Sequence, residues 1–258
     1  MEAVKKIAII GHGYVGKMVA YGFDTPHIEQ CLIDPIYGTE VDSLAGKNMD
    51  VAFVCVPTPM GKNGKIDASI VVDVVAKLKH FDGIIAVKSS VTPDIMRQLA
   101  QNEKVVYNPE FLREKSALED FINASMLVLG GKAEYTSQIQ ALYEKYSRCQ
   151  PCPVYHMTVQ EASFVKYGIN SFLATKVVWF NQFKDLADQY QANYDTIIQA
   201  MCADGRIGHS HLQVPGVDGK RGFGGACFPK DTKAFAAMGG EMLSILDAAI
   251  SANDQYRG

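Results

Sequence analysis

The sequence has no long hydrophobic run, no repeated unit and no strong excess of one charge. Of its 258 residues, 48% are hydrophobic and 21% are charged, and the formal net charge is −3. This composition is typical of a globular protein with a core, and it excludes collagenous and intrinsically disordered chains. The apolar runs are too short to span a bilayer, which argues against a membrane protein. The small negative charge provides no general attraction for nucleic acid, although a local basic site could still hold a phosphate.

Cysteines are few, and the N-terminus has no secretion signal. The first apolar stretch lacks a small-residue cleavage site, so it is expected to form a strand, and the protein is expected to be cytoplasmic. Six scattered cysteines are too sparse for a disulfide scaffold. Cys149 and Cys152 have the spacing of a redox or half-zinc motif, but no second pair follows, and no metal site is expected. His209 and His211 are interpreted as plain loop residues.

The first half alternates short β-branched apolar runs with amphipathic segments, which predicts a parallel sheet covered by helices on both faces. The expected strands are Lys6–Ile10, Cys31–Ile33, Val51–Val56, Gly83–Lys88, Lys104–Tyr107 and Met126–Leu129. The expected helices among them include Tyr14–Phe23, Ser69–Lys79, Pro93–Gln101 and Glu134–Tyr146. The predicted fold class is therefore α/β, with a Rossmann-like parallel sheet.

After about Tyr155 the strand signals stop and the pattern becomes helical. Apolar residues at helical spacing predict one long helix from Val159 to Tyr190, followed by helices at Tyr194–Cys202 and Thr232–Ala252. We therefore expect an α/β domain over residues 1–157 and an all-α domain over residues 158–258. Residues 204–225 contain seven of the 22 glycines and predict a long loop, which in a compact domain is usually functional or disordered.

A glycine-rich turn follows the first expected strand directly. The turn consists of Gly11, His12, Gly13, Tyr14, Val15 and Gly16. Its spacing allows a tight turn and lets a helix N-terminus face a pyrophosphate, although such spacing also occurs by chance. The next strand ends in Asp34, 18 residues beyond Gly16, where a carboxylate can bind adenosine ribose and would repel a 2′-phosphate. We therefore expect NAD as the cofactor, in preference to NADP.

Polar side chains follow three later strands of the expected sheet. These strands lead into Pro57 and Thr58, into Ser89 and Ser90, and into the segment Asn108–Glu114. Ligands of open α/β sheets bind at the carboxyl ends of the strands, so these residues are candidates for a site. If the last segment is helical, Glu110 and Glu114 share a face, either as acid/base groups or as plain surface charges.

Two further groups lie in the helical half. Lys166 and Asn170 are four residues apart, so an ammonium and an amide could converge on one substrate oxygen, or form an exposed polar stripe. Cys227 lies at an expected helix start, where the helix dipole and Lys230 would favour the thiolate. Asp231, one turn further on, could relay a proton or orient a water. A buried structural cysteine is the alternative, but the glycine-rich approach favours a nucleophile.

Taken together and in this order, these motifs resemble the UDP-glucose/GDP-mannose dehydrogenase family across nearly the whole chain. The matching positions are Gly11–Gly16, Val56–Pro59, Lys88–Ser90, Asn108–Glu114, Lys166, Asn170, Arg206–Gly208 and Gly224–Asp231. The resemblance implies an NAD-binding Rossmann domain, then a helical domain that forms a homodimer and supplies a catalytic cysteine.

The resemblance also implies a reaction, in which the C6 alcohol of a nucleotide sugar becomes a carboxylate and two NAD and one water are consumed. Asp231 with water takes the hydroxyl proton, while Lys166 and Asn170 stabilise the oxygen. Cys227 then captures the aldehyde as a thiohemiacetal, whose oxidation gives a thioester. Glu110 activates the water that hydrolyses this thioester.

Binding roles follow from the same resemblance. Ser90 helps to hold the hydrolytic water, Glu114 lies near the nicotinamide, and Arg206 reaches the substrate of a neighbouring subunit. The implied cofactor-binding residues are Gly11, Gly13, Tyr14, Val15, Gly16, Asp34, Pro57, Thr58, Ser89 and Glu114. The implied substrate-binding residues are Phe111, Leu112, Arg113, Lys166, Asn170, Arg206, Phe223 and Gly224.

Three departures from the family pattern are expected to matter. The family's third domain, which closes over the nucleotide, is missing after Gln255. The segment Pro35–Asp50 is shorter than the family's second βα unit. The family threonine is Ser90 here, and the glycine of the following turn is Asp94.

Several functions remain open at this point. UDP-glucose is the expected substrate because it is the commonest in that family, while UDP-N-acetyl sugars and GDP-mannose are alternatives. A single-step dehydrogenase of the 6-phosphogluconate or β-hydroxyacid type would share the fold and the lysine–asparagine pair but would not need Cys227. A third alternative is an inactive nucleotide-binding remnant, or a subunit completed by a separate third domain.

Overall fold

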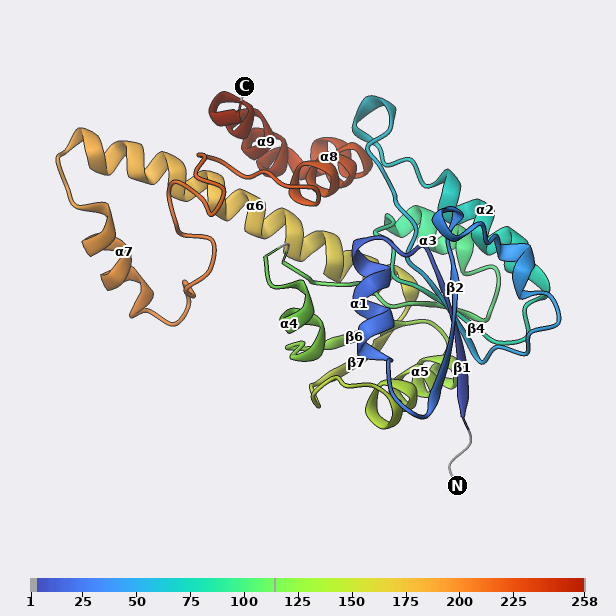
Figure 1. Cartoon of the computed structure of the whole chain (residues 1–258). Coiled ribbons are helices and arrows are strands. Elements are labelled where there is room, and N and C mark those ends of the chain that lie inside the picture. Colours follow the sequence, from blue (N-terminus) through green and yellow to red (C-terminus); the bar gives the residue numbers. More distant parts are fainter. Residues whose placement is uncertain (1–3, 114, 258) are drawn as a thin grey trace. The chain divides into compact units, whose positions relative to one another are not determined.

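The chain, described by a computed structural model over residues 4–113 and 115–257, contains two compact units. The first comprises Met1–Pro59 and Ile66–Lys166, and the second comprises Met60–Lys65 and Tyr167–Gly258. The short segment Met60–Lys65 therefore belongs with the helical half, although it interrupts the α/β half in sequence. Figure 1 shows the elements of both units.

A seven-stranded sheet of order β2-β1-β3-β4-β5-β6-β7 forms the first unit. The strands are β1 (Lys5–Ile10), β2 (Ile28–Ile33), β3 (Val51–Val54), β4 (Ile84–Val87), β5 (Val105–Tyr107), β6 (Leu127–Gly130) and β7 (Val154–Met157). Strands β1 to β5 are parallel, which confirms the Rossmann-like α/β class. The order reverses at β1, whose neighbours are β2 and β3, and this is the point where open α/β sheets bind ligands.

The sheet departs from a fully parallel arrangement at β6, which pairs antiparallel with β5. The chain leaves β5 at Tyr107, stays at the same end of the sheet through a short helix α4 (Ala117–Ile122), and returns along β6. Neither α4 nor β7 was expected from the sequence. β7 pairs parallel with β6 at the edge of the sheet, and its side chains are half-buried or exposed, so it lacks an apolar alternation.

Helices cover the sheet on both faces. They are α1 (Tyr14–Gly22), α2 (Ser69–Lys77), α3 (Pro93–Leu99), α4 and α5 (Ala133–Tyr146). Side chains of α1, α4 and α5, among them Val19, Phe121 and Tyr143, pack with Ile9 and Phe53 of the sheet into one core. Figure 1 shows α2 and α3 on the other side of the sheet. Because both faces are covered, all four residues of β3 are buried, as its continuous apolar run predicts.

The connection between β2 and β3 is short. It contains only two 3-10 turns, η1 (Pro35–Tyr37) and η2 (Val41–Leu44). No α-helix lies between β2 and β3, a stretch that the structure describes throughout. β2 is an edge strand of the sheet, and η1 begins directly after Asp34.

Helices make up most of the second unit. Helix α6 (Val159–Gln189) has 31 residues, begins in the first unit and continues into the second, and α7 (Tyr194–Cys202) follows it. The single helix expected near Thr232–Ala252 is in fact two, α8 (Phe228–Gly239) and α9 (Ser244–Arg257), joined by a 3-10 turn. Gly240 ends α8 with a φ of +52°, a conformation that favours glycine, so the glycine pair at 239 and 240 stops the helix.

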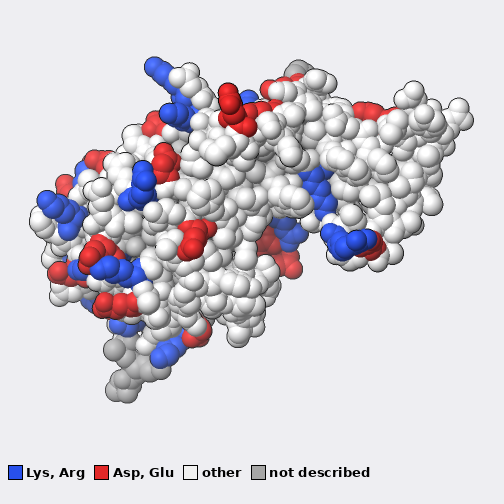
Figure 2. Space-filling view, turned by 180° about the vertical axis from the view of Figure 1, so that it is seen from behind, with Lys and Arg blue, Asp and Glu red and all other residues white. Residues whose placement is uncertain are grey.

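One stretch of the described residues, Phe228–Arg257, is long and apolar enough for a membrane span by length and composition alone. This stretch was not expected from the sequence, and one such stretch is only weak evidence of a membrane-spanning helix. It contains the break between α8 and α9, and Asp231 and Thr232 within it are buried. On the face drawn in Figure 2, positive and negative side chains are interspersed, in line with the balanced composition.

Candidate functional site

The glycine turn lies between the ends of β1 and β3, and its three glycines have different surroundings. A Cβ on Gly11, whose φ is +89°, would lie 2.8 Å from the carbonyl oxygen of Cys55. A Cβ on Gly16 would lie 2.0 Å from the carbonyl oxygen of Gly11. A Cβ on Gly13, the N-cap of α1, would meet nothing within 4 Å. Gly11 and Gly16 are therefore required by the turn itself, while Gly13 leaves open space at the helix N-terminus, the kind of position at which dinucleotide folds hold a pyrophosphate.

Asp34 lies beside this turn, as the spacing predicts. Its Oδ2 accepts a hydrogen bond from the His12 backbone N–H at 2.6 Å, and its Oδ1 accepts one from the Ile36 N–H at 3.0 Å. The bond from His12 is the main cause that lowers the pKa of Asp34, followed by the bond from Ile36. The carboxylate is ionised at neutral pH and keeps lone pairs for two ribose hydroxyls. His12 and Tyr37 share this corner and were not expected from the sequence.

The hydroxyl residues at the strand ends differ in their roles. Ser89 Oγ donates to the carbonyl oxygen of Val56 at 2.6 Å, so this hydroxyl joins the ends of β3 and β4. Thr58 is buried, Pro57 is exposed and Ser90 is half-buried. Ser89 therefore has a structural bond in addition to any contact with a cofactor.

Lys88 is a buried lysine at the end of β4, and no role of its own was expected for it from the sequence. Its side chain donates to the backbone oxygen of Asn108 at 3.2 Å and to Asn108 Oδ1 at 3.1 Å. The hydroxyl of Tyr143, on α5, donates to the same Oδ1 at 2.9 Å. Burial lowers the pKa of Lys88. This network fixes the start of the segment that carries Glu110.

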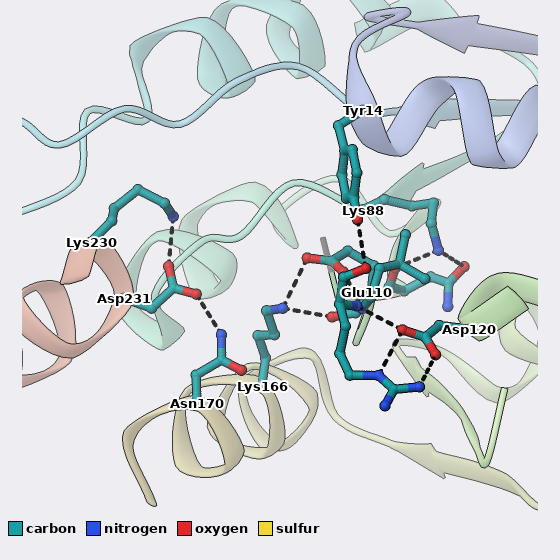
Figure 3. Close-up of polar contacts among 11 residues, drawn as sticks. Tyr14, Lys88, Glu110, Asp120, Lys166, Asn170, Lys230 and Asp231 are labelled. Carbon is teal, nitrogen blue, oxygen red and sulfur yellow. Dashed lines mark hydrogen bonds and ion pairs between the residues drawn. The ribbon is translucent and has the colours of Figure 1, made fainter. Parts of the chain in front are cut away.

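Glu110 and Lys166 form a buried ion pair within the first unit, drawn in Figure 3. Lys166 Nζ lies 3.0 Å from Glu110 Oε1 and 2.6 Å from the Glu110 backbone oxygen. The other carboxylate oxygen accepts the Leu112 N–H at 2.6 Å. Burial acts to raise the pKa of Glu110, but the Lys166 charge and the Leu112 bond outweigh it, and the pKa is lowered. Glu110 is therefore ionised, in the form that a general base requires.

The segment that carries Glu110 is not helical over residues 108–113, so the condition under which Glu110 and Glu114 would share a helical face is not met there. Glu114 lies outside the described residues. Backbone groups of this segment bond to side chains: Arg113 O accepts from the Tyr14 hydroxyl at 2.9 Å, and Arg113 N donates to Asp120 at 2.8 Å.

Arg113 is paired before any substrate arrives. Its guanidinium lies 2.6 Å from Asp120 Oδ1, and its side chain is otherwise exposed. Phe111 and Leu112 are half-buried, and the Phe111 ring centroid lies 5.5 Å from Lys166 Nζ. A cavity of about 300 Å³ adjoins this segment. It is lined in part by Lys88, Asn108, Glu110, Arg113, Phe121 and Tyr143.

In the second unit, Asn170 and Lys230 hold a fully buried carboxylate. Asp231 Oδ2 accepts from Asn170 Nδ2 at 2.7 Å, and Asp231 Oδ1 accepts from Lys230 Nζ at 2.6 Å. Figure 3 shows both contacts. Lys166 and Asn170 lie one turn apart on α6, and each is bonded to a carboxylate. Lys166 is bonded to Glu110 and Asn170 to Asp231, and their convergence on one substrate oxygen stays a prediction.

Cys227 is the N-cap residue of α8, and Pro229 lies in the first turn. The backbone oxygen of Cys227 accepts from the Asp231 N–H at 2.8 Å, which closes the first turn of the helix. The half-buried sulfur thus belongs to a helix N-terminus, as the sequence predicts, where the dipole favours a thiolate. The ammonium of Lys230, which was expected to favour the thiolate, lies 2.6 Å from Asp231 Oδ1.

The remaining candidates lie in the loop before α8. Phe223 is buried, and its backbone N–H donates to Asn253 Oδ1 on α9 at 2.7 Å. Gly224 lies beside the Arg257 guanidinium, which a Cβ would approach to 2.7 Å. Arg206 is exposed and paired with Asp204. Within the described ranges no group of three or more His, Cys, Asp or Glu is arranged to hold a metal ion, and none of the six cysteines forms a disulfide.

A parallel sheet with a glycine turn and an acidic residue at its reversal point, joined to a helical unit, defines the class of dinucleotide-binding α/β proteins. Residues 36–147 match the NAD binding domain of the UDP-glucose/GDP-mannose dehydrogenase family, and residues 160–255 match its central domain. The chain therefore belongs to the UDP-glucose/GDP-mannose dehydrogenase family.

Individual relatives agree with this assignment. The chain is 30% identical to the UDP-glucose 6-dehydrogenase TuaD of Bacillus subtilis over 98% of this chain and 64% of that protein. A UDP-glucose dehydrogenase from Pyrobaculum islandicum superimposes with a TM-score of 0.80 at 26% identity, covering 98% of this chain and 68% of that one. A Mycobacterium tuberculosis 3-hydroxyisobutyrate dehydrogenase shares the fold, with a TM-score of 0.76 at 15% identity, over 98% of this chain and 94% of its own. The chain thus spans about two thirds of the length of the nucleotide-sugar dehydrogenases it matches.

Proposed function

We propose that the chain acts as a nucleotide-sugar 6-dehydrogenase that converts UDP-glucose, two NAD⁺ and water into UDP-glucuronate and two NADH. The observation that carries the proposal is a cysteine at the N-terminus of α8 with the buried Asp231 one turn away. A single-step alcohol dehydrogenase has no use for such a nucleophile, whereas oxidation to an acid requires the aldehyde carbon to be held for a second oxidation.

The first half of the reaction removes a hydride and a proton from the C6 alcohol. NAD supplies the hydride acceptor in both halves and is held by Gly11–Gly16 and Asp34. Asp231, through water, takes the hydroxyl proton, and Asn170 keeps that carboxylate in place. The ammonium of Lys166 and the amide of Asn170 stabilise the charge that develops on the substrate oxygen.

The second half starts with the sulfur of Cys227. The thiolate adds to the aldehyde carbon, and the carbonyl oxygen gains a proton, which gives a thiohemiacetal. Loss of a hydride and of that proton gives a thioester. Glu110, ionised in its pair with Lys166, accepts a proton from water. The resulting hydroxide attacks the thioester carbon, the carbon–sulfur bond breaks, and the carboxylate leaves with Cys227 regenerated.

The remaining residues carried over from the family have binding roles in this proposal. Pro57, Thr58 and Ser89 border the cofactor, and Ser90 helps to hold the water. Phe111, Leu112, Arg113, Phe223 and Gly224 border the sugar nucleotide, and Arg206 serves the site of a second copy. Because the Arg113 guanidinium is already paired with Asp120, the main chain of this segment is the part available to contact the sugar nucleotide.

We propose in addition that two copies associate through α6. Phe172, Trp179 and Leu186 recur every seven residues along this helix, and their exposed fractions are 69%, 49% and 52%. Large apolar side chains at a seven-residue interval are typical of a helix that packs against another helix. A second copy of α6 would cover this stripe.

The test is an end-point assay of the purified chain with NAD⁺ and a panel of UDP- and GDP-sugars, in which NADH is counted per sugar consumed. Two NADH per UDP-glucose are expected. One NADH per sugar would instead support a single-step dehydrogenase, a type whose fold this chain shares. No turnover with measurable NAD binding would indicate a chain that needs a partner or is inactive.

A further inference from the structure

His12 and Tyr37 form a side-chain pair next to Asp34. The Tyr37 hydroxyl and His12 Nδ1 lie 2.7 Å apart, and the two ring centroids are 5.5 Å apart. His12 comes from the glycine turn after β1, and Tyr37 comes from the 3-10 turn η1 after β2. The pair therefore bridges the two loops between which the adenosine half of a dinucleotide binds in a Rossmann fold.

The backbone of η1 holds Tyr37 in place without a ligand. Asp34 caps the turn by accepting the Ile36 N–H, and Pro35 occupies its first turn. Gly38 ends it with a φ of +67°. The Thr39 hydroxyl accepts the Asp34 N–H at 2.9 Å and thereby closes the loop. All of these interactions are made by residues within the turn or next to it. The turn therefore has this conformation before any ligand binds.

The side chains that this turn presents are unusually apolar for a surface. Ile36 is 71% exposed and Tyr37 is 49% exposed. The neighbouring carboxylate, Asp34, is already fixed by the His12 N–H and is the residue that binds adenosine ribose in this fold. The adenine base attached to that ribose is flat and largely apolar, so it needs an apolar side-chain wall to pack against. An aromatic ring provides such a surface well.

We propose that Tyr37 is the wall against which the adenine of NAD stacks, and that His12 is a positioning residue that holds the phenol in the stacking orientation. The proposal rests on the proposed use of NAD. In the tautomer that carries its hydrogen on Nε2, His12 accepts the phenolic hydrogen at Nδ1, which removes one rotational freedom of the Tyr37 hydroxyl and fixes the ring before the base arrives.

Binding of ADP-ribose and NADH to the full chain tests the role of Tyr37, by calorimetry and by NADH fluorescence. Base stacking on an aromatic ring contributes enough that Y37A should weaken both ligands by about tenfold. Y155A is the matched control, because Tyr155 is equally exposed at 52% but lies on β7, at the opposite edge of the sheet. Thermal unfolding of each variant without ligand reports whether the fold is kept, and Y37F provides a second variant that retains the ring.

The role of His12 is tested by a double-mutant cycle. Y37F and H12F each remove the bond between the rings, and each should weaken ADP-ribose by about fivefold, the worth of one hydrogen bond. The double variant should be no weaker than either single one. Additive losses would show that His12 does not act through Tyr37.

Two results would overturn the proposal, and they differ. If the unsubstituted chain binds NADH and Y37A binds it equally well, Tyr37 is not the adenine wall, while the use of NAD stands. If the unsubstituted chain binds neither NADH nor ADP-ribose, the use of NAD fails first and the inference falls with it.

Discussion

The side chain of Lys166 holds Glu110 through two atoms, the carboxylate Oε1 at 3.0 Å and the backbone oxygen at 2.6 Å. The bond to the backbone oxygen holds the chain segment at Glu110 in place, and the ion pair keeps the Glu110 carboxylate ionised. Both side chains are almost completely buried, at 3% and 7% exposure. A buried pair of this kind does not need to add stability, but removal of one partner leaves an uncompensated charge.

The pair predicts how stability depends on pH. The folded pKa of Glu110 lies below its unfolded value, so its contribution is complete above the unfolded pKa and is lost as the pH falls through the folded pKa. E110Q should lower the free energy of unfolding at pH 7 by about 3–5 kcal/mol, since it leaves Lys166 unneutralised. Between pH 7 and pH 3 the difference from the unsubstituted chain should shrink. Urea unfolding at several pH values measures it.

E134Q is the control for that series, because Glu134 is an exposed carboxylate in the first turn of α5. Its curve should run parallel to that of the unsubstituted chain. A constant gap between E110Q and the unsubstituted chain over the whole pH range would contradict the assignment.

Substitution by alanine should have different effects at Gly13 and Gly16, on NADH binding at the first and on stability at the second. G16A places a Cβ 2.0 Å from the rigid carbonyl oxygen of Gly11, and overpacking of this kind should cost about 1–3 kcal/mol of stability. G13A meets no atom within 4 Å and should leave the ligand-free fold intact. It fills the space of the pyrophosphate, however, and should weaken NADH by about tenfold or more, equivalent to about 1.4 kcal/mol. Thermal unfolding and NADH titration of both variants separate the two roles, and unchanged NADH affinity in G13A would refute the phosphate assignment.

The parts of the molecule that local rules determine could be predicted from the sequence. The glycine turn and the cap position of Cys227 depend on residues a few positions apart, and the structure has them where they were expected. Asp34 also lies where it was expected, at the end of β2, although its contact with His12 joins residues 22 positions apart. The helix break at Gly240 and the strand β7 were missed, because an isolated glycine pair is a weak stop signal and an exposed edge strand has no apolar alternation.

Contacts between distant segments could not be predicted. The network of Lys88, Asn108 and Tyr143 joins residues 20 to 55 positions apart, and no periodic pattern marks it. The same holds for Lys166, which looked like a partner of Asn170 on one helix face but bonds to Glu110, 56 residues away. Sequence spacing identified the chemistry of these groups, whereas their partners follow from the fold.

If two copies associate through the apolar stripe on α6, one charged residue introduced into that stripe should dissociate the dimer. L186E places a carboxylate within the proposed contact, where burial without a partner is costly. The unsubstituted chain should have the mass of a dimer in light scattering at micromolar concentration, and L186E should have the mass of a monomer with an unchanged circular dichroism spectrum. Q199E adds the same charge on the exposed surface of α7 and should remain dimeric. A monomeric unsubstituted chain would contradict the proposed contact.

Cys227 provides the prediction on which the covalent mechanism depends. C227S keeps the size and the cap position of the residue but replaces the sulfur, and an oxygen ester route is a poor substitute for a thioester. Formation of the sugar acid should therefore fall by at least about a thousandfold, as for other catalytic nucleophiles. NADH affinity should be unchanged, because Gly11–Gly16 and Asp34 belong to the other unit. C202S, at a half-buried free cysteine at the end of α7, is the matched control and should keep full activity. Acid formation by C227S at the rate of the unsubstituted chain would exclude the thioester and leave Cys227 a structural cap of α8.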